Sequence, residues 1–480
     1  MNDGSPGPGP QHSPRPWRLI LAALVAAEIT ATFESQMILA ALKDLYTEFR
    51  DPVGVGWLLS AYLLVAAASA AICGRLGDLY GRKRMLVFLL FAAMLGSMLS
   101  AWGPNLEWVI AGRALQGVAG AVFPLCFGLL REHMPESRME FAGGALISAS
   151  GVAAILGLVI GGLVVDNLSW RDLFWLSAGM AAVVMVLTLL VVPKDKPRVQ
   201  STDLDVLGGI LFVPGIGGLM LAVSKASEWG ISDPTLVLVG GGAIALLVWW
   251  VRHELSHPNP LLDIRALGRK EIAFTNLAFA CTALGPFQLT LTMMLLLQQS
   301  PAAGIGFGLT ATAAGALKIP ANVASVLVSP LAGYFCRLAG ERWIIRTGLL
   351  LNVMSWSLLF LGYENLWFVL GVIIASTVGT SICYVGVSNN IARIVPAGRV
   401  SESVGVTMLV RSVSHACGSQ IVTVMLGGAV LAQGMDSPVA VYFRAFAFVL
   451  VASVGGLLVA SALPPRNGRN RPASIASAQA

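Results

Sequence analysis

Charged residues are scarce in this chain. Only 12% of its 480 residues are Asp, Glu, Lys or Arg, whereas ordinary soluble domains contain about 25%. Hydrophobic residues make up 56%, and the mean hydropathy is +0.77. This composition excludes an ordinary soluble domain. The net charge of +6 comes from bases scattered among many loops, so we expect no nucleic acid partner.

Residues that hold metals or nucleotides are equally sparse. The chain has five His, and its six Cys fall in apolar segments or at their ends, without metal-ligand spacing: Cys73, Cys126, Cys281, Cys336, Cys383 and Cys417. The phosphate-binding pattern G-x-x-x-x-G-K-[ST] does not occur, which excludes direct use of ATP. We therefore expect no metal and no cofactor, and the cysteines are interpreted as small packing residues.

Long apolar runs recur from end to end, and each is long enough to cross about 30 Å of hydrocarbon as a helix. The predicted fold class is an all-α polytopic membrane protein with fourteen transmembrane helices. Their expected ranges are 17–42, 53–73, 84–102, 106–130, 141–165, 171–193, 205–225, 235–252, 272–298, 308–334, 342–361, 365–389, 401–431 and 441–463.

The distribution of Lys and Arg predicts the orientation. With both termini in the cytoplasm, the cytoplasmic loops and tails hold 23 of the 31 bases. The external turns hold five, and three lie within helices. Because cytoplasmic loops are enriched in bases, we expect a multi-pass protein of the cytoplasmic membrane with both termini inside.

The run GRLGDLYGRKRML at 74–86 lies between two predicted helices and is the most specific motif in the chain. Its spacing resembles G-x-x-x-D-x-x-G-R-[KR]-[KR], the signature loop of the major facilitator superfamily. The resemblance implies a conformational switch formed by Gly74, Asp78, Gly81 and Arg82. A weaker copy follows the predicted helix at 308–334, where Gly333, Arg337 and Gly340 repeat the spacing with another charge order.

The run RALQG at 113–117 resembles R-x-x-Q-G, a motif of the proton-driven members of the superfamily. Four further runs resemble the fourteen-helix drug:proton antiporter family, which consists of multidrug efflux transporters. They are FESQMILAAL at 33–42, SWRDLF at 169–174, PNPLL at 258–262 and the stretch from Arg411 to Gly418. The run at 157–162 departs from the family pattern G-P-x-x-G-G, because Leu158 replaces its proline. The resemblance implies two six-helix bundles, with two inserted helices between them and a substrate site between the halves.

Two acids, Glu28 and Glu34, lie well inside a predicted helix, the one at 17–42. Carboxylates at this depth normally face water or a partner and mark paths of ions or substrates. We predict that Glu34, Glu28 and Arg113 couple transport to protons, with Arg113 as the counter-charge. The alternatives are structural ion pairs or snorkelling for the acids, and hydrogen bonding of Arg113 to helix carbonyls.

Other polar residues at membrane depth are candidates for the substrate cavity: Lys318, Arg411, His415, Gln288 and Asn322. Lys318 lies too deep to reach water easily by snorkelling. It pairs with Glu28 or Glu34, binds an anionic group of the substrate, or lies in a water-filled cavity without a role in coupling. His415 is open between cavity lining and packing, and helix-to-helix hydrogen bonding is the alternative for the amides.

The predicted function is proton-coupled export of small amphipathic molecules by alternating access. The alternatives are uptake or export of one metabolite or organic anion, a polytopic membrane enzyme, and a sensor that transports nothing. Partners are a small-molecule substrate, protons and the lipid bilayer; we expect a monomer, and the sequence does not identify a periplasmic adaptor. We expect a disordered tail at 1–16, bundles at 17–193 and 272–463, an insert at 194–271 and a tail at 464–480.

Overall fold

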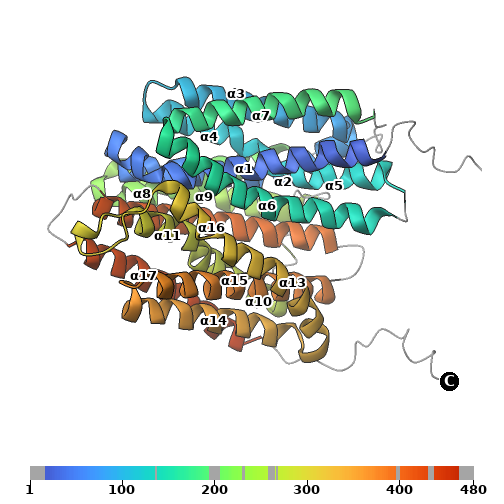
Figure 1. Cartoon of the computed structure of the whole chain (residues 1–480). Helices are drawn as coiled ribbons and strands as arrows, with labels where there is room; N and C mark the ends of the chain where they lie inside the picture. Colours follow the sequence, from blue (N-terminus) through green and yellow to red (C-terminus); the bar gives the residue numbers. More distant parts are fainter. Residues whose placement is uncertain are drawn as a thin grey trace, which may run out of the picture.

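The computed structural model describes residues 17–135, 138–193, 206–229, 233–257, 265, 269–395, 400–430 and 437–463. Within these ranges the chain is almost wholly helical and forms no strand (Figure 1). Thirteen helical spans in the described ranges are long and apolar enough to cross a membrane. A further helix, α8 (Val206–Trp229), completes the fourteen that the sequence predicts, so the expected fold class is confirmed.

The N-terminal helices, coloured blue to green, form the upper bundle of Figure 1. Helix α1 packs against α6 and α7, α3 packs against α4 and α7, and α2 packs against α4 and the short 3-10 helix η1. Their bounds are α1 (Trp17–Phe49), α2 (Pro52–Tyr80), α3 (Arg82–Trp102), α4 (Leu106–Gln116), η1 (Gly117–Ala121), α5 (Val122–His133), α6 (Met139–Asn167) and α7 (Trp170–Val191).

The C-terminal helices form the lower bundle (Figure 1). Helix α14 packs against α15 and α17, α13 packs against α15, and α10 packs against α16 and α17. Their bounds are α10 (Lys270–Leu284), η4 (Pro286–Gln288), α11 (Leu289–Gln298), η5 (Pro301–Ala303), α12 (Ala311–Ala316), α13 (Ile319–Ala339), α14 (Glu341–Gly362), α15 (Leu366–Ile394), α16 (Val400–Val430) and α17 (Pro438–Ser461).

Three of the predicted helices are interrupted, which the hydrophobic runs did not indicate. The helix expected at 106–130 contains η1, and the one expected at 272–298 breaks around η4. The helix expected at 308–334 begins at Ala311 and breaks between α12 and α13, just before Pro320. Proline has no N–H and its ring clashes with the carbonyl one turn earlier, so Pro286 and Pro320 each stand at the start of a new segment.

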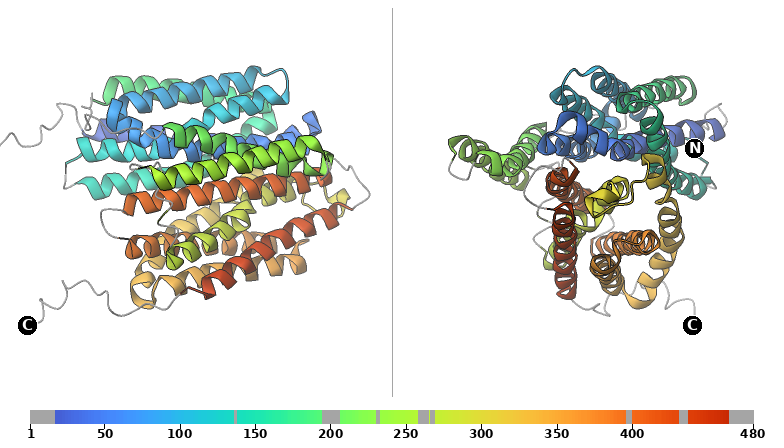
Figure 2. Two further views of the ribbon diagram at one scale, coloured as in Figure 1. Left: turned by 180° about the vertical axis from the view of Figure 1, so that it is seen from behind. Right: turned by 60° about the vertical axis from the view of Figure 1, so that its left-hand side comes forward.

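The two helices between the bundles, α8 and α9 (Pro234–Ser256), pack mainly against each other. Leu211 and Phe212 of α8 and Trp250 of α9 form a small apolar cluster with Ala68 of α2 and Val406 of α16. The pair thus touches both bundles, and the right-hand view of Figure 2 places it at the periphery of the molecule.

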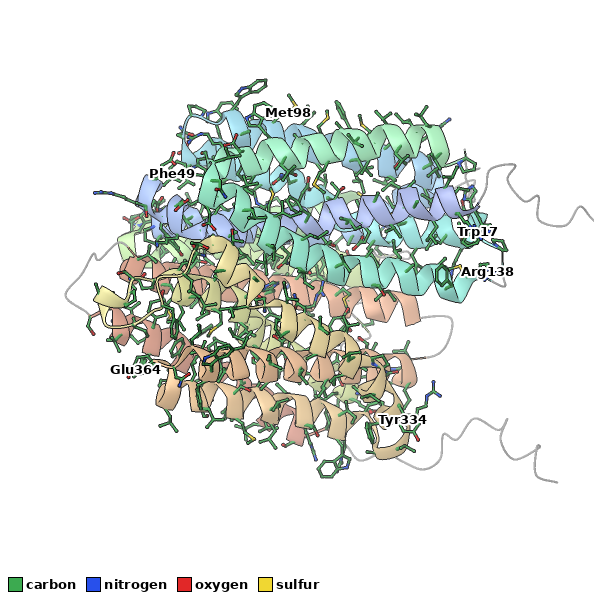
Figure 3. The ribbon with its side chains drawn as sticks, viewed as in Figure 1. Trp17, Phe49, Met98, Arg138, Tyr334 and Glu364 are labelled. Atoms are coloured by element: carbon green, nitrogen blue, oxygen red, sulfur yellow. The ribbon has the colours of Figure 1, made fainter. Side chains whose placement is uncertain are left out.

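The bundle has two ends, which Figure 3 identifies by labelled residues. Trp17, Arg138 and Tyr334 lie at one end, called the Trp17 end below. Phe49 and Glu364 lie at the other, the Glu364 end. Helix α1 begins and α17 ends at the Trp17 end (Figure 1).

Candidate functional site

Helix α1 carries the buried acids Glu28 and Glu34 and lies at the boundary between the bundles. It packs against α6 and α7 of its own bundle and also contacts α11, α12 and α16 of the other. Because six residues turn a helix through about 240°, Glu28 and Glu34 face different neighbours. Glu34 meets α7, and Glu28 meets α6.

Glu34 is fully buried. The hydroxyl of Ser177 on α7 donates a hydrogen bond of 2.7 Å to its Oε1, and Ser177 lies 3.1 Å from the hydroxyl of Ser97 on α3. Among the described residues, the second carboxyl oxygen, Oε2, has no hydrogen-bond partner. An unsatisfied buried oxygen is rare in native structures, and it leaves this carboxyl one place to hold a proton.

Arg113 is also fully buried and binds main-chain carbonyls. Its Nη1 donates 2.9 Å to the carbonyl oxygen of Glu34, and its Nε donates 3.1 Å to the carbonyl oxygen of Leu58. The guanidinium lies 4.4 Å from the centre of the Tyr62 ring, a cation–π distance, and its Nη2 has no partner. Arg113 therefore adjoins Glu34, as predicted, but forms no ion pair with its carboxylate in the described part of the chain.

Gln116 connects Arg113 to the hydroxyls around Glu34. Arg113 Nη1 donates 2.8 Å to Gln116 Oε1, and Gln116 Nε2 donates 2.6 Å to Ser97 Oγ. All three residues are fully buried. The resulting chain of hydrogen bonds, called the Glu34 network below, joins α1, α2, α3, α4 and α7.

Glu28 has a simpler environment. The hydroxyls of Ser150 on α6 and Thr32 on α1 donate to its Oε1 at 2.6 and 3.0 Å. Only 5% of Glu28 is exposed. Glu28 is therefore linked to α6 alone, in contrast to the five helices of the Glu34 network.

In the C-terminal bundle, Lys318 lies at the break between α12 and α13. It is 5% exposed, and its Nζ donates a hydrogen bond of 2.8 Å to the hydroxyl of Thr290 on α11. Within the described ranges it makes no ion pair, so the predicted pairing with Glu28 or Glu34 is absent from this structure.

The other cavity candidates gather partly around η4. Gln288 is buried and donates to the carbonyl oxygens of Ala283 and His415, so it joins two helices as the packing alternative predicted. The half-buried His415 ring contacts Phe287 edge-on. Arg411, also half-buried, lies 5.9 Å from the Tyr384 ring centre, and Asn322 lies one turn beyond Lys318.

The signature loop and its weak copy share one backbone geometry. Gly81 (φ 99°) joins α2 to α3, and Gly340 (φ 91°) joins α13 to α14; each donates its N–H to the carbonyl four residues earlier. Positive φ strains residues with a Cβ, which explains glycine at both turns. Gly74 and Asp78 lie within α2, and the Asp78 side chain is outside the described part of the structure.

The residues after these glycines form ion pairs of opposite polarity. Arg82 donates 2.9 Å to Glu132 on α5, whereas Glu341 accepts from Arg393 on α15 at 3.2 Å. Arg82 also donates 2.9 Å to the carbonyl of Gly128. An ion pair therefore stabilises the equivalent turn in each repeat, with the positions of acid and base exchanged.

The bundles meet closely toward the Glu364 end. Asp166 on α6 accepts hydrogen bonds of 2.9 Å from the N–H groups of Ala311 and Thr312, at the start of α12. A Cβ added at Gly162 would lie 2.4 Å from the Thr312 nitrogen, and one at Gly315 would lie 2.8 Å from the Leu158 oxygen. This contact of α6 with α12 is called the Asp166 seam below.

A second contact between the bundles joins α1 and α2 to α16. Tyr46 donates 2.6 Å to the Thr423 carbonyl, and Ser60 donates 3.0 Å to Gln420, which itself donates to the Val53 carbonyl. Both of these contacts, the Asp166 seam and the bonds from α1 and α2 to α16, lie at mid-membrane or toward the Glu364 end.

The sequence as a whole matches one family. The family model described as Major Facilitator Superfamily matches residues 24–419, which is most of the chain. The chain belongs to the major facilitator superfamily. It is therefore a multi-pass membrane protein, in agreement with its helical spans.

Several superfamily members resemble the chain along much of its length. Multidrug resistance protein Stp of Mycobacterium tuberculosis is 27% identical over 406 residues, covering 83% of this chain and 73% of Stp. Lincomycin resistance protein LmrB of Listeria monocytogenes is 28% identical, covering 70% of each. The matches to the Bacillus subtilis MFS-type transporters YvkA and YhcA span only 58% and 62% of those proteins.

Solved structures share the fold at low sequence identity. The POT family transporter PepTSo aligns with a TM-score of 0.63 at 14% identity, covering 94% of this chain and 99% of its own. A variant of the nucleoside transporter NupG aligns with a TM-score of 0.66 at 11% identity, covering 92% and 99%. These superfamily structures support the fold alone.

The sequence did not predict several residues that form hydrogen bonds with Glu34, Arg113 or Lys318 or extend the Glu34 network. Gln116 lies in the quoted motif RALQG, so a polar residue one turn after Arg113 was a usable signal. Ser97, Ser177 and Thr290 sit in apolar helices without any distinguishing spacing. The predicted motif at 258–262 lies outside the described residues, and no group of His, Cys, Asp and Glu in the described ranges has metal-binding geometry.

Proposed function

We propose that this protein exports small amphipathic compounds across the cytoplasmic membrane in exchange for protons. The printed names of Stp and LmrB, which denote multidrug and lincomycin resistance, support a substrate class of toxic small molecules. Membership of the superfamily supports transport rather than membrane-bound catalysis.

The observation that carries proton coupling is the Glu34 network. Its carboxyl is fully buried, accepts one hydrogen bond from Ser177 and keeps Oε2 free of any partner. Loss or gain of a proton on Glu34 changes a buried charge that lies next to the Arg113 guanidinium. Since that charge is costly at membrane depth, its protonation state favours one arrangement of the five helices over another.

Arg113 supports this coupling by a different contact from the predicted one. It holds the α1 main chain at Glu34 and the α2 main chain at Leu58 together. A movement of α1 against α2 or α4 changes the distances from these two carbonyls and from Gln116 to the guanidinium of Arg113, their common donor. We propose that Arg113 couples protonation of Glu34 to displacement of α1 against α2 and α4.

The distribution of contacts between the bundles supports alternating access. The Asp166 seam and the bonds of Tyr46, Ser60 and Gln420 close the Glu364 end. With the Trp17 end in the cytoplasm, as the bases predict, this arrangement corresponds to a transporter closed toward the outside. The two rocking units are then residues 17–193 and 272–463, with 194–271 as a peripheral insert.

Orientation is tested by fusing periplasmic or cytoplasmic reporters behind selected residues. Fusions after residues 252 and 463 should report the cytoplasm, and a fusion after Glu364 should report the outside. A periplasmic signal after residue 252 would contradict both the fourteen-helix topology and the proposed closed side.

Antiport is tested with purified full-length protein in liposomes that carry an imposed pH gradient. Uptake of a cationic dye such as ethidium should require the gradient and should be accompanied by proton movement in the opposite direction. Protein-free liposomes and a protonophore provide the controls. Dye movement that persists unchanged after the gradient has collapsed would refute proton coupling, and no movement of any compound in a broad panel would refute export.

A further inference from the structure

Lys318 is a buried cation with little compensation. The residue is 5% exposed, and the one described hydrogen bond of its side chain goes to the neutral hydroxyl of Thr290. An ammonium group carries three donors and a full charge, so Thr290 satisfies only part of it. Buried charges are normally paired, and a charge without a carboxylate partner at this depth indicates that its partner arrives from elsewhere.

The acids of α1 are not that partner in this structure. Glu28 is held by Ser150 and Thr32, and Glu34 is held by Ser177, so each is bonded within its own bundle. Lys318 is bonded within the other bundle. The structure therefore leaves the cation available to a ligand.

The backbone beside Lys318 adds further donors. Helix α13 begins immediately after Lys318, and its first described bond runs from the N–H of Asn322 to the Lys318 carbonyl. The N–H groups of Ile319 and Ala321 thus belong to the first turn, which has no intrahelical acceptors, while Pro320 has no N–H. The positive end of the α13 dipole lies at the main chain of Lys318, and a helix N-terminus, like the ammonium group, favours an anion.

Lys318 lies near the boundary between the two bundles. Gly315, three residues earlier, lies against the main chain of Leu158 on α6. The preceding residue on α6, Gly157, lies against Gln36 on α1. One turn of α6 therefore contacts α1 on one side and α12 on the other, which places Lys318 beside the boundary where the proposed substrate site lies.

We propose that Lys318, Thr290 and the N-terminus of α13 bind an anionic group of the transported compound, such as a carboxylate or sulfonate. Thr290 accepts from Lys318 and retains its own hydroxyl proton for the ligand. This inference rests on the proposed export function and specifies its substrate class: amphipathic compounds with an acidic group are handled along with, or in place of, cationic ones.

Binding is tested first, because it does not depend on transport. Carboxyfluorescein, an acidic dye, should bind the purified full-length protein in detergent, as measured by anisotropy, and sulfate should compete. Lys318→Met should weaken binding by about tenfold or more, which corresponds to about 1.4 kcal/mol. Lys318→Arg keeps the charge and should retain most of the affinity. Absence of binding to the unaltered protein would overturn the proposal.

Transport in liposomes then separates this inference from the proposed function. Lys318→Met should reduce carboxyfluorescein transport by about tenfold while ethidium transport changes less than about twofold. Lys225→Met, the same change in the peripheral helix α8, is the matched control and should leave both dyes unaffected. Transport of ethidium with unchanged carboxyfluorescein behaviour in Lys318→Met would overturn the anion site and leave export standing.

Two other outcomes also reject the anion site. Equal loss of both dyes in Lys318→Met and Lys318→Arg, with a lowered melting temperature, would indicate a purely structural lysine. Restoration of a defective Lys318→Met protein by Glu34→Gln or Glu28→Gln would indicate pairing between the bundles in another conformation.

Failure of the unaltered protein to move either dye while it still binds carboxyfluorescein would reject export but support the site.

Discussion

The two bundles share a fold but treat buried charge in opposite ways. In the N-terminal bundle, Glu34 and Arg113 belong to a network that joins five helices through carbonyl, amide and hydroxyl groups. In the C-terminal bundle, the ammonium group of Lys318 makes one described hydrogen bond, and the residue stands at a helix break. In the first arrangement several protein groups surround the charges, although Glu34 Oε2 and Arg113 Nη2 have no partner in the described ranges. In the second, one hydroxyl is the only described partner of the ammonium group.

This difference indicates separate roles for the N-terminal and C-terminal bundles. A closely bonded network has few alternative arrangements. A change of protonation within it therefore alters the hydrogen bonds of every helix that it connects. A sparsely bonded cation at a break accepts ligands of different shape, because little protein structure must be undone. We infer that the N-terminal bundle senses protons and the C-terminal bundle recognises the substrate.

The largest expected effect concerns Glu34. Glu34→Gln keeps the size and the bond from Ser177 but cannot ionise, so it should abolish proton-driven dye transport in liposomes. Its effect on the free energy of unfolding should stay within about 0.5–1.5 kcal/mol, the value of one hydrogen bond. Glu364→Gln, at an exposed acid, is the control for expression and reconstitution.

The same substitution at Glu28 sharpens the comparison. Glu28 contacts only α6 and its own helix, so Glu28→Gln should slow transport without uncoupling it from protons. If Glu28→Gln uncouples transport and Glu34→Gln retains a normal pH dependence, the roles assigned to the two acids are exchanged.

The second prediction concerns closure at the Asp166 seam. In Gly162→Ala the new methyl group would meet the Thr312 main chain at 2.4 Å, a distance that only separation of the bundles relieves. Overpacking of this kind costs about 1–3 kcal/mol, so the population closed at the Glu364 end should fall by about tenfold. Spin labels placed at the exposed Glu107 and Glu364 report the separation.

Gly144→Ala is the matched control, because no atom lies within 4 Å of the added Cβ. It lies on the same helix, α6, and should leave the distance distribution unchanged. Equal shifts in the two variants would show that alanine perturbs α6 itself and that the seam is not specifically involved.

The helices and several site residues could be predicted from the sequence because membrane thickness imposes long apolar runs. Depth alone identified Glu34, Glu28 and Lys318. The breaks were not predicted, although Pro286 and Pro320 mark two of them, because hydropathy averages over windows longer than a helical turn. The actual partners of Arg113 and Glu34 depend on which helices are neighbours. A single serine in an apolar helix, such as Ser177, does not indicate which helix it faces.

Asp166→Ala should have a smaller effect on the same seam. The change removes the acceptor for two N–H groups of α12, but Asp166 is exposed and water replaces it in part. We expect a loss of about 1 kcal/mol in the closed state, the usual value of a helix cap. Asp233→Ala removes a cap within α9 and should not change the label distances; a matching change there would contradict the role of Asp166.

The smallest expected effect distinguishes the two braced turns. Arg82→Gln removes a half-buried ion pair with Glu132 and a bond to the Gly128 carbonyl, whereas Glu341→Gln leaves Arg393 paired with Glu271. Glu341 is buried, but its partner Arg393 is partly exposed, and ion pairs screened by solvent contribute about 0–1 kcal/mol, so Glu341→Gln should lower stability by about 1 kcal/mol at most. Arg82→Gln should lower it by about 1 kcal/mol more, because a carbonyl also loses its donor. Chemical unfolding of the two variants, with transport rates at saturating dye, measures the difference. Equal losses of stability and transport rate in the two variants would mean that the two turns contribute equally. The functional asymmetry between the bundles would then be confined to the buried charges.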